Sequence, residues 1–276
     1  MPEPRTDVGE PQRETLVQID QVYLQRDRPL HWDVYRPASA GKAARPAVLV
    51  LHGGGWRRGD RGMVAPAATV LAQLGFVALA VEYRLLGEAP WPAPLDDVTA
   101  ALRSAVDQAD SLGIDSSQLF VMGYSAGGHL ALLAASQHGA PAVAGVAAFF
   151  APIRLGPQDA GMLDVALSAI AAASPMTFAD RMPPTILFAG DGDRMVPASH
   201  AIDLHSAMRA AGRVADLRLY SDLIHEFVRL PGMMRITLED AVAFFRRTSL
   251  DRDDFSLASA QLAAWWEQML PKRPES

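Results

Sequence analysis

Short apolar runs of strand length alternate with helical patterns along most of this 276-residue chain. The runs contain few polar residues, which is typical of strands covered on both faces in a parallel sheet. The segments between them have the apolar spacing of amphipathic helices. The expected strands cover residues 47–51, 76–81, 118–122, 143–150, 185–189 and 215–220, and the expected helices cover 64–74, 94–112, 129–136 and 198–211. This alternation predicts a doubly wound α/β sheet.

The two ends of the chain depart from this pattern. Residues 1–15 are polar and contain prolines and acidic residues, so we expect them to be disordered. Residues 16–24 and 30–35 read as two short strands that pair as an antiparallel edge. We expect residues 16–276 to form a single domain that ends in two helices over residues 235–270.

An insertion over residues 153–182 separates two of the expected strands. It is apolar and rich in alanine, and it is too long for a tight turn. We expect it to form a small helical cap. The last predicted helix contains Trp265 and Trp266, which we expect to pack on the core or on another subunit. A homodimer is therefore left open.

The composition excludes several functions. The net charge of -6 is mixed along the chain without a block of like charge, which argues against nucleic acid and an anionic membrane surface as partners. The absence of cysteine excludes thiolate catalysis, disulfides and cysteine-ligated zinc. The sequence as written has neither an apolar run of about 18 residues that could span a bilayer nor a secretory signal. We therefore expect a cytoplasmic protein.

One serine, Ser125, lies between two glycines at the junction of an expected strand and an expected helix, in Gly123-Tyr-Ser-Ala-Gly127. In this context the pattern G-x-S-x-G is that of a nucleophile elbow. Side chains two residues before and after the serine would collide in so tight a turn, and glycine removes that clash. Ser125 is the expected nucleophile, and the alternative is a serine that caps a glycine-rich helix start.

Three consecutive glycines follow the first expected parallel strand, in the sequence HGGGW at residues 52–56. Consecutive glycines allow backbone N–H groups to approach the oxyanion of an acyl-transfer intermediate. The expected donors are Gly54 and Gly55, together with Ala126 after the nucleophile. We expect His52 to brace this loop by hydrogen bonding. A phosphate-binding loop fits less well, because the chain has neither of the common glycine patterns of such loops.

A serine nucleophile needs a base, and the base needs an acid that orients it. The chain order in hydrolases with this elbow is serine, acid, histidine. Past the elbow and its helix start, His138 ends a helix, and His200 and His205 are expected to be exposed on another. His225 follows the last expected strand, from which it can reach back to the serine, and it is the expected base.

Aspartates at the end of the expected strand 185–189 supply candidates for the acid. Asp191 and Asp193 both lie there, and Asp222 is a more distant candidate. Asp191 is also suited to capping or turning its loop. Position alone leaves the choice between the first two open.

These segments together resemble the α/β-hydrolase superfamily, and within it the hormone-sensitive-lipase-like and feruloyl-esterase-like (BD-FAE-type) carboxylesterases. The resemblance covers residues 47–227 through the motifs HGGGW, GYSAGG, GDGDRMVP and IHEF. It implies the α/β-hydrolase fold, a mostly parallel central sheet flanked by helices with a small helical cap. It also implies that Asp193 is the acid of a triad with Ser125 and His225. Glu226 departs from the many relatives that have glycine there, and it puts a charge near the site.

The same resemblance implies a serine carboxylesterase that hydrolyses short to medium acyl esters through an acyl-enzyme, with a small-molecule ester as substrate and with no metal or organic cofactor. In a further matching segment, residues 83–97, it implies structural roles for Arg84 and Asp97. An arylformamidase similar to kynurenine formamidases is the alternative enzyme. A binding protein without catalysis, similar to the gibberellin receptors, is the alternative from another class.

Overall fold

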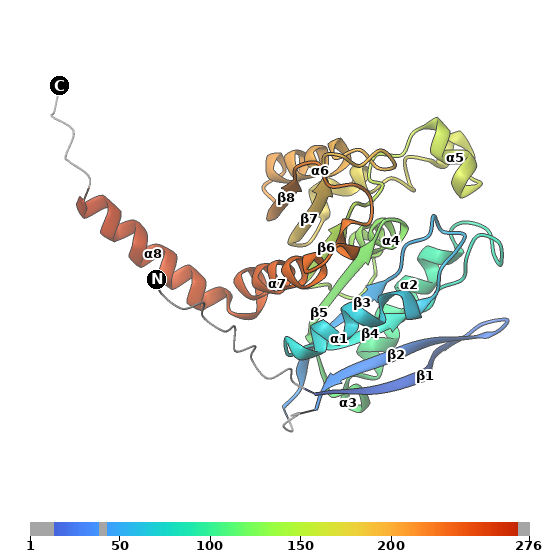
Figure 1. Ribbon diagram of the computed structural model, residues 1–276, viewed down its shortest axis with the longest axis horizontal. Coiled ribbons are helices and arrows are strands. Elements are labelled where there is room, and N and C mark those ends of the chain that lie inside the picture. The colour runs from blue at the N-terminus through green and yellow to red at the C-terminus, as the bar shows by residue number, and fades with distance from the viewer. Residues whose placement is uncertain (1–13, 39–42, 270–276) are drawn as a thin grey trace, which may run out of the picture.

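A central sheet of eight strands organises the protein in the computed structural model, which describes residues 14–38 and 43–269 (Figure 1). The strand order is β1-β2-β4-β3-β5-β6-β7-β8. The strands are β1 (Thr15–Gln25), β2 (Pro29–Pro37), β3 (Arg45–Leu51), β4 (Val77–Val81), β5 (Ile114–Tyr124), β6 (Gly145–Phe149), β7 (Thr185–Gly190) and β8 (Ala215–Tyr220). From β4 to β8 all pairs are parallel, whereas β1 and β2 form an antiparallel edge. The predicted sheet and its antiparallel edge are confirmed.

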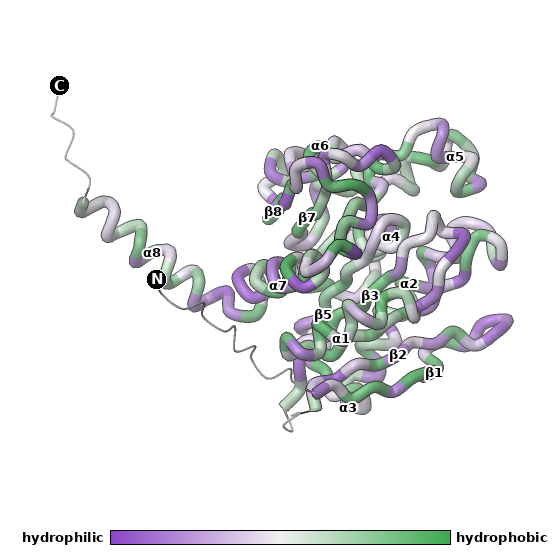
Figure 2. The backbone as a smooth tube through the Cα atoms, viewed as in Figure 1, coloured by the Kyte–Doolittle hydropathy of each residue, from purple (hydrophilic) through white to green (hydrophobic). Residues whose placement is uncertain are grey.

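Helices cover both faces of this sheet, which explains why its central strands are apolar on both sides. The helices are α1 (Ala65–Gln73), α2 (Ala93–Asp107), α3 (Ala109–Leu112), α4 (Ala126–Ser136), α5 (Pro157–Leu163), α6 (Ser199–Ala210), α7 (Met233–Phe245) and α8 (Arg252–Met269). One core cluster joins α2, α4 and α6 to the sheet, and another joins α1 and α7 to the opposite face. The central strands are accordingly hydrophobic along their length, while the tip of the β1–β2 hairpin is hydrophilic (Figure 2).

Helix ends differ from the predicted ones where the local backbone sets another boundary. The helix expected over 94–112 divides at Gln108 into α2 and α3, and Gly113 ends it with a φ of 64°. Helix α4 begins at Ala126, three residues before the expected start, because Gly127 and Gly128 are already helical. The disorder expected for residues 1–15 falls outside the described residues except at 14 and 15, and Thr15 already belongs to β1.

The C-terminal helices form as expected, but the last one does not pack on the core. A π-helical turn at Arg246–Leu250 joins α7 to α8, and α8 extends away from the sheet (Figure 1). Trp265 and Trp266 are 48% and 53% exposed. The expectation of packing on the core was therefore wrong, and packing on a second subunit stays a prediction.

Loops at the carboxyl ends of the parallel strands carry the insertion and the expected site residues. Residues 153–182 contain α5 and two 3-10 segments, Leu167–Ala169 and Pro175–Arg181.

Within residues 14–38 and 43–269, no helix combines the length and the apolarity that crossing a membrane would require.

Candidate active site

Ser125 occupies the turn between β5 and α4 in an unusual backbone conformation. Its φ is 51° and its ψ is -118°, a strained combination for a residue with a side chain. The turn is held by the N–H of Ser125, which donates to the carbonyl of Phe149 at 2.8 Å, and by the N–H of His129, which donates to the carbonyl of Ser125 at 3.0 Å. The strain therefore persists because the neighbouring strand and the first helical turn fix the backbone on both sides.

The glycines on either side of this turn leave no room for a side chain. A Cβ atom on Gly123 would lie 2.3 Å from the carbonyl group of Gly127. A Cβ atom on Gly127 would lie 2.4 Å from the carbonyl oxygen of His52 and 2.5 Å from that of Leu51. The first clash is the collision expected across the elbow. The second shows that the backbone leading into the glycine loop lies directly against the start of α4.

Ser125, His225 and Asp193 form one hydrogen-bonded chain. The Ser125 Oγ lies 3.1 Å from the His225 Nε2, and the His225 Nδ1 lies 2.6 Å from the Asp193 Oδ2. The imidazole is largely buried, and its ring packs edge-on against Phe150 at 4.8 Å between centroids. The structure thus brings together Ser125, His225 and, of the two candidate aspartates, the one that the resemblance implied; they come from the loops after β5, β8 and β7.

The two aspartates of the β7 loop have different partners. Asp193 is buried, and its Oδ1 accepts the N–H groups of Met195 and Val196 at 2.8 and 2.9 Å while its Oδ2 faces the histidine. Asp191 is exposed, and its Oδ1 accepts the N–H of Asp222 at 2.5 Å. Asp191 therefore ties the acid loop to the histidine loop, and Asp193 alone of the two contacts the imidazole.

The glycine loop lies beside the serine and borders the same pocket. Gly54 and Gly55 adopt φ angles of 119° and 61°, which glycine tolerates best. Both line the pocket with Ser125 and Ala126. Ala126 is the first residue of α4, so its N–H has no partner within that helix. The three expected oxyanion donors are thus gathered around the serine.

His52 is buried under this loop and does not line the pocket beside Ser125. Its Nδ1 lies 2.7 Å from the carbonyl oxygen of Gly53, and its ring stacks on Tyr83 at 4.3 Å between centroids. The Tyr83 hydroxyl donates to the His52 carbonyl at 2.8 Å. Burial lowers the pKa of His52, which favours its neutral form. These contacts agree with the bracing role expected from the sequence.

A buried bridge that the sequence analysis missed connects the glycine loop to the cap. The Trp56 indole N–H donates to the His129 Nδ1 at 3.2 Å, and the His129 Nε2 lies 2.7 Å from the carbonyl oxygen of Ala173. Burial lowers the pKa of His129 to about 4, so the ring is neutral at pH 7, with its proton on Nε2. A histidine within the apolar run HLALLAA was the available signal, since a buried histidine needs two partners.

His200 is not the exposed helical histidine that was expected. It lies on α6 with its ring partly buried, and its Nδ1 accepts the N–H groups of Ile153 and Arg154 at 2.9 and 3.2 Å. The start of the cap therefore contacts the ring, and His200 also lines the pocket beside Ser125. Burial lowers the pKa of His200. Helical periodicity alone could not reveal this cover, because the cap comes from another part of the chain.

Glu226 has the left-handed backbone expected of a glycine position, with a φ of 59°. Its carboxylate pairs with Arg229 at 2.8 Å, and the residue borders the pocket that contains Ser125. The negative charge of Glu226 that we expected near the site thus lies at the rim of the pocket, where Arg229 partly neutralises it.

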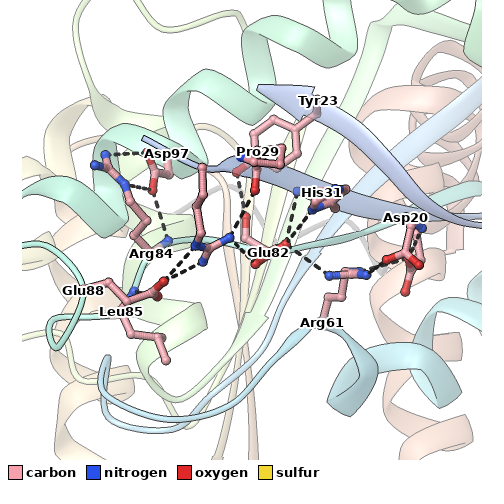
Figure 3. A network of polar contacts seen from close by, with 12 residues as sticks. Asp20, Tyr23, Pro29, His31, Arg61, Glu82, Arg84, Leu85, Glu88 and Asp97 are labelled. Atoms are coloured by element: carbon pink, nitrogen blue, oxygen red, sulfur yellow. Dashed lines mark hydrogen bonds and ion pairs between the residues drawn. The ribbon is translucent and has the colours of Figure 1, made fainter. Parts of the chain in front are cut away.

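Ion pairs beside the glycine loop hold residues 82–97 in place (Figure 3). Arg84 donates two hydrogen bonds to the fully buried carboxylate of Asp97, at 2.8 and 2.9 Å. In the same segment, the N–H of Leu86 donates a hydrogen bond to the carbonyl oxygen of Trp56 at 2.8 Å. The structural role implied for Arg84 and Asp97 agrees with these contacts, which support the glycine loop from outside the pocket.

Two hollows border the site: Ser125 lines the larger one, and its neighbour Tyr124 lines the smaller one. The larger hollow has a volume of about 750 Å³ and lies between the glycine loop, the cap and the acid loop. Besides the site residues, its lining includes Arg57, Pro152, Gln158, Met162, Met195 and His200. The smaller has a volume of about 140 Å³ and lies on the α1 and α7 face. Glu226 borders both.

Two family models and several known proteins are similar to parts of this chain. The family model BD-FAE matches residues 32–150, and the model of the prolyl oligopeptidase family matches residues 157–251. The chain is 43% identical over 93 residues to carboxylesterase NlhH of Mycobacterium tuberculosis, which covers 33% of this chain and 28% of that protein. It is 42% identical over 106 residues to an ethyl acetate hydrolase of Pseudomonas putida, covering 38% of this chain and 33% of the relative. The matched stretch thus spans a third or less of these curated relatives.

Solved structures extend the likeness over most of the chain. The structure of Thermogutta terrifontis esterase 2 phosphonylated by cyclosarin superposes with a TM-score of 0.75 at 25% identity, covering 84% of this chain and 94% of that one. Its propionate-bound form gives the same TM-score at 24% identity. With its mostly parallel sheet, its flanking helices and this structural likeness, the chain has the α/β-hydrolase fold, and its residues 32–150 are similar to the BD-FAE family.

Proposed function

We propose that this protein is a serine carboxylesterase that hydrolyses small esters of short to medium acyl chains. The observation that carries the proposal is the hydrogen-bonded chain from Ser125 through His225 to Asp193, with contacts of 3.1 and 2.6 Å. Geometry of this kind activates a serine hydroxyl at neutral pH. The likeness to NlhH and to the ethyl acetate hydrolase supports an ester as substrate.

The residues of the site fit the steps of acyl transfer. The His225 Nε2 takes the proton of Ser125 as its Oγ attacks the ester carbonyl carbon, and Asp193 stabilises the imidazolium that forms. The N–H groups of Gly54, Gly55 and Ala126 stabilise the oxyanion. Collapse of this intermediate expels the alcohol, which receives the proton from His225, and leaves an acyl group on Ser125.

Water completes the cycle by the same route in reverse. His225 takes a proton from a water molecule whose oxygen attacks the acyl carbon, and the second tetrahedral intermediate releases the carboxylic acid and restores the Ser125 hydroxyl. The likeness to an ethyl acetate hydrolase supports the short acyl chains of this proposal.

The test is the initial rate on p-nitrophenyl esters from acetate to decanoate, with the Ser125→Ala variant as the blank. We expect a wild-type rate that peaks at short acyl chains and a loss on the order of 10⁶ in kcat in the variant. A wild-type rate equal to the blank at every length would refute the esterase. Turnover of N-formyl arylamines instead would identify the arylformamidase, and ligand binding without turnover would identify the binding protein.

A further inference from the structure

An ester that reacts with Ser125 occupies the larger hollow, because Ser125 and His225 line that hollow and not the smaller one. Its volume of about 750 Å³ leaves room for more of the substrate than the ester group alone. Much of the remaining wall is apolar and comes from Pro152, Met162, Met195, Val196 and Pro197. His200, on α6, adds a polar ring to the same wall.

The two nitrogens of the His200 ring have different surroundings. Nδ1 accepts the backbone N–H groups of Ile153 and Arg154 at 2.9 and 3.2 Å. A ring nitrogen that accepts N–H groups carries no proton, so the proton of the neutral ring is on Nε2. Burial lowers the pKa of His200, which favours this neutral form. Nε2 is therefore a hydrogen-bond donor whose direction the cap fixes.

This donor is accessible and has no partner in the described part of the chain. Within residues 14–38 and 43–269, the His200 Nε2 makes no hydrogen bond, and it is not one of the buried polar atoms that lack a partner. The cap contacts the ring at Nδ1, so the ring edge that carries Nε2 is the open one. A fixed donor with no protein partner thus belongs to a wall residue of the pocket that contains the nucleophile.

The charges around His200 favour a neutral acceptor over an anionic one. Asp159 lines the same pocket, and after burial it has the largest effect on the pKa of His200. Arg154 has the next-largest effect, but it is paired with Asp203 at 2.7 Å. A carboxylate held at Nε2 would be repelled by Asp159, whereas an ether, keto or hydroxyl oxygen would not.

We propose that His200 determines substrate specificity, and that its Nε2–H group binds a neutral acceptor oxygen of the substrate that is separate from the ester group. The inference rests on the ester hydrolysis proposed above and names the class of ester. A plain alkyl ester covers the apolar wall but leaves the donor without a partner. An ester with an additional oxygen covers the same wall and satisfies the donor.

The test replaces one methylene group of a substrate by an oxygen atom. For the acyl chain, p-nitrophenyl hexanoate is compared with the 4-methoxybutanoate and the 3-ethoxypropanoate. For the alcohol, pentyl acetate is compared with 2-ethoxyethyl acetate and 3-methoxypropyl acetate. The ratio of kcat/KM for the oxygen-containing ester to that for the plain ester is measured in the wild type and in His200→Asn. Dividing one ratio by the other cancels the intrinsic reactivity of each ester.

His200→Asn removes the Nε2 donor and keeps an acceptor for the cap, because the amide oxygen of asparagine lies as many bonds from the backbone as Nδ1. We expect the wild-type ratio to exceed that of His200→Asn by roughly three- to tenfold for at least one oxygen position, the effect of one neutral hydrogen bond. Equal ratios in all four comparisons would overturn the proposal. A larger effect of His200→Asn on p-nitrophenyl hemiglutarate than on the ether esters would show that the acceptor is anionic, contrary to the proposal.

A second histidine of the same helix provides the matched control. His205 lies on α6 but does not line the pocket, so His205→Asn should leave every ratio at its wild-type value. His200→Phe removes both ring nitrogens and should lose the oxygen preference as His200→Asn does. An equal loss in His205→Asn, or a wild-type ratio in His200→Phe, would contradict the assignment to His200.

A binding measurement separates this subsite from the proposed function. In Ser125→Ala labelled with ¹⁵N-histidine, nuclear magnetic resonance should show His200 with its proton on Nε2, assigned by the loss of this signal in Ser125→Ala/His200→Asn. The preferred oxygen-containing ester should shift this Nε2 signal, and the matched plain ester should not. If no ester is hydrolysed but the signal shifts, the esterase fails and the subsite stands. If esters are hydrolysed but neither the ratios nor the signal respond, the subsite fails and the esterase stands.

Discussion

At the scale of single residues, Asp191 and Asp193 lie two positions apart on one loop and have separate partners. We expect Asp193→Asn to lower kcat by about 10³–10⁴, because an amide no longer holds the imidazole in the reactive tautomer. Asp191→Asn keeps an oxygen that can accept the Asp222 N–H, so its kcat should stay within a fewfold of wild type. Steady-state kinetics on p-nitrophenyl acetate measures both. Equal losses in the two variants would contradict the assignment of the acid.

A second matched pair lies in the glycine loop. A Cβ atom on Gly54 would lie 2.0 Å from the carbonyl oxygen of Arg58, whereas one on Gly55 meets nothing within 4 Å. Gly54→Ala must therefore move the loop and its N–H, and we expect kcat to fall about 10²–10³-fold, the effect of one oxyanion donor. Gly55→Ala should lose less than about tenfold, because its cost is the left-handed backbone alone. A loss of kcat in Gly55→Ala larger than that in Gly54→Ala would show that the glycine loop does not have the described position.

Ser125, His225 and the glycine loop could be selected from the sequence as candidates, because each stands in a motif whose local geometry is fixed. The elbow, the glycine run and the histidine loop are each recognised from a motif of four to six consecutive residues. Choosing Asp193 over Asp191 required the resemblance, since both end the same strand. The roles of His129 and His200 were not predictable, because their partners Ala173 and Ile153 come from the cap, whose path the sequence does not specify.

At the scale of elements, the bridge through His129 makes the stability of the fold depend on pH. The unfolded chain binds a proton at the ordinary histidine pKa of about 6.5, whereas the folded chain resists it until about pH 4. The unfolded state therefore binds more protons between these values, and the free energy of unfolding falls as the pH drops from about 6.5 to about 4, by up to about 3 kcal/mol.

His129→Gln provides the control for this effect. The glutamine amide can accept the Trp56 N–H and donate to the Ala173 carbonyl, but it does not titrate. Urea unfolding at pH 7, 5.5 and 4.5 should show a steeper loss in the wild type than in His129→Gln. Parallel losses in the two proteins would mean that other groups cause the acid sensitivity.

The segment that supports the glycine loop depends on one buried carboxylate. Removing it in Asp97→Ala leaves Arg84 unpaired in a largely buried place, and we expect a loss of about 3–5 kcal/mol in unfolding free energy. Glu239→Ala breaks the exposed pair of Glu239 with Arg235 on α7 and should cost no more than about 0.5 kcal/mol. Urea denaturation compares the two. A small effect of Asp97→Ala would show that the segment has other sufficient anchors.

At the scale of the whole molecule, the central strands were predictable because a strand covered on both faces needs a continuous apolar run. Residues 47–51 and 185–189 are such runs, and the helices that cover them repeat their own pattern. The strand order was not predicted, because apolar runs do not specify which strands are neighbours in the sheet. The position of α8 was not predictable, because apolar residues on a helix do not reveal what lies against them.

The exposed last helix leads to a prediction about assembly. The described side chains of α8 are exposed or partly exposed, among them Phe255, Leu262 and Trp266. A chain that ends after Asp251 should therefore keep the Tm and the esterase rate of the full chain. If α8 mediates the homodimer left open by the sequence, sedimentation should show a dimer for the full chain and a monomer for the shortened one. A large loss of Tm on shortening would contradict the exposed position of α8.

The cap supplies walls to the larger pocket, such as Gln158, Asp159 and Met162, but none of the three residues of the hydrogen-bonded chain at Ser125. The pocket walls supplied by the cap and the hydrogen-bonded chain are thus encoded in different stretches of the gene. Under the proposed function, libraries randomised over α5 should change which esters are accepted while acylation of Ser125 persists. One short helix can then vary without altering the hydrogen-bonded chain.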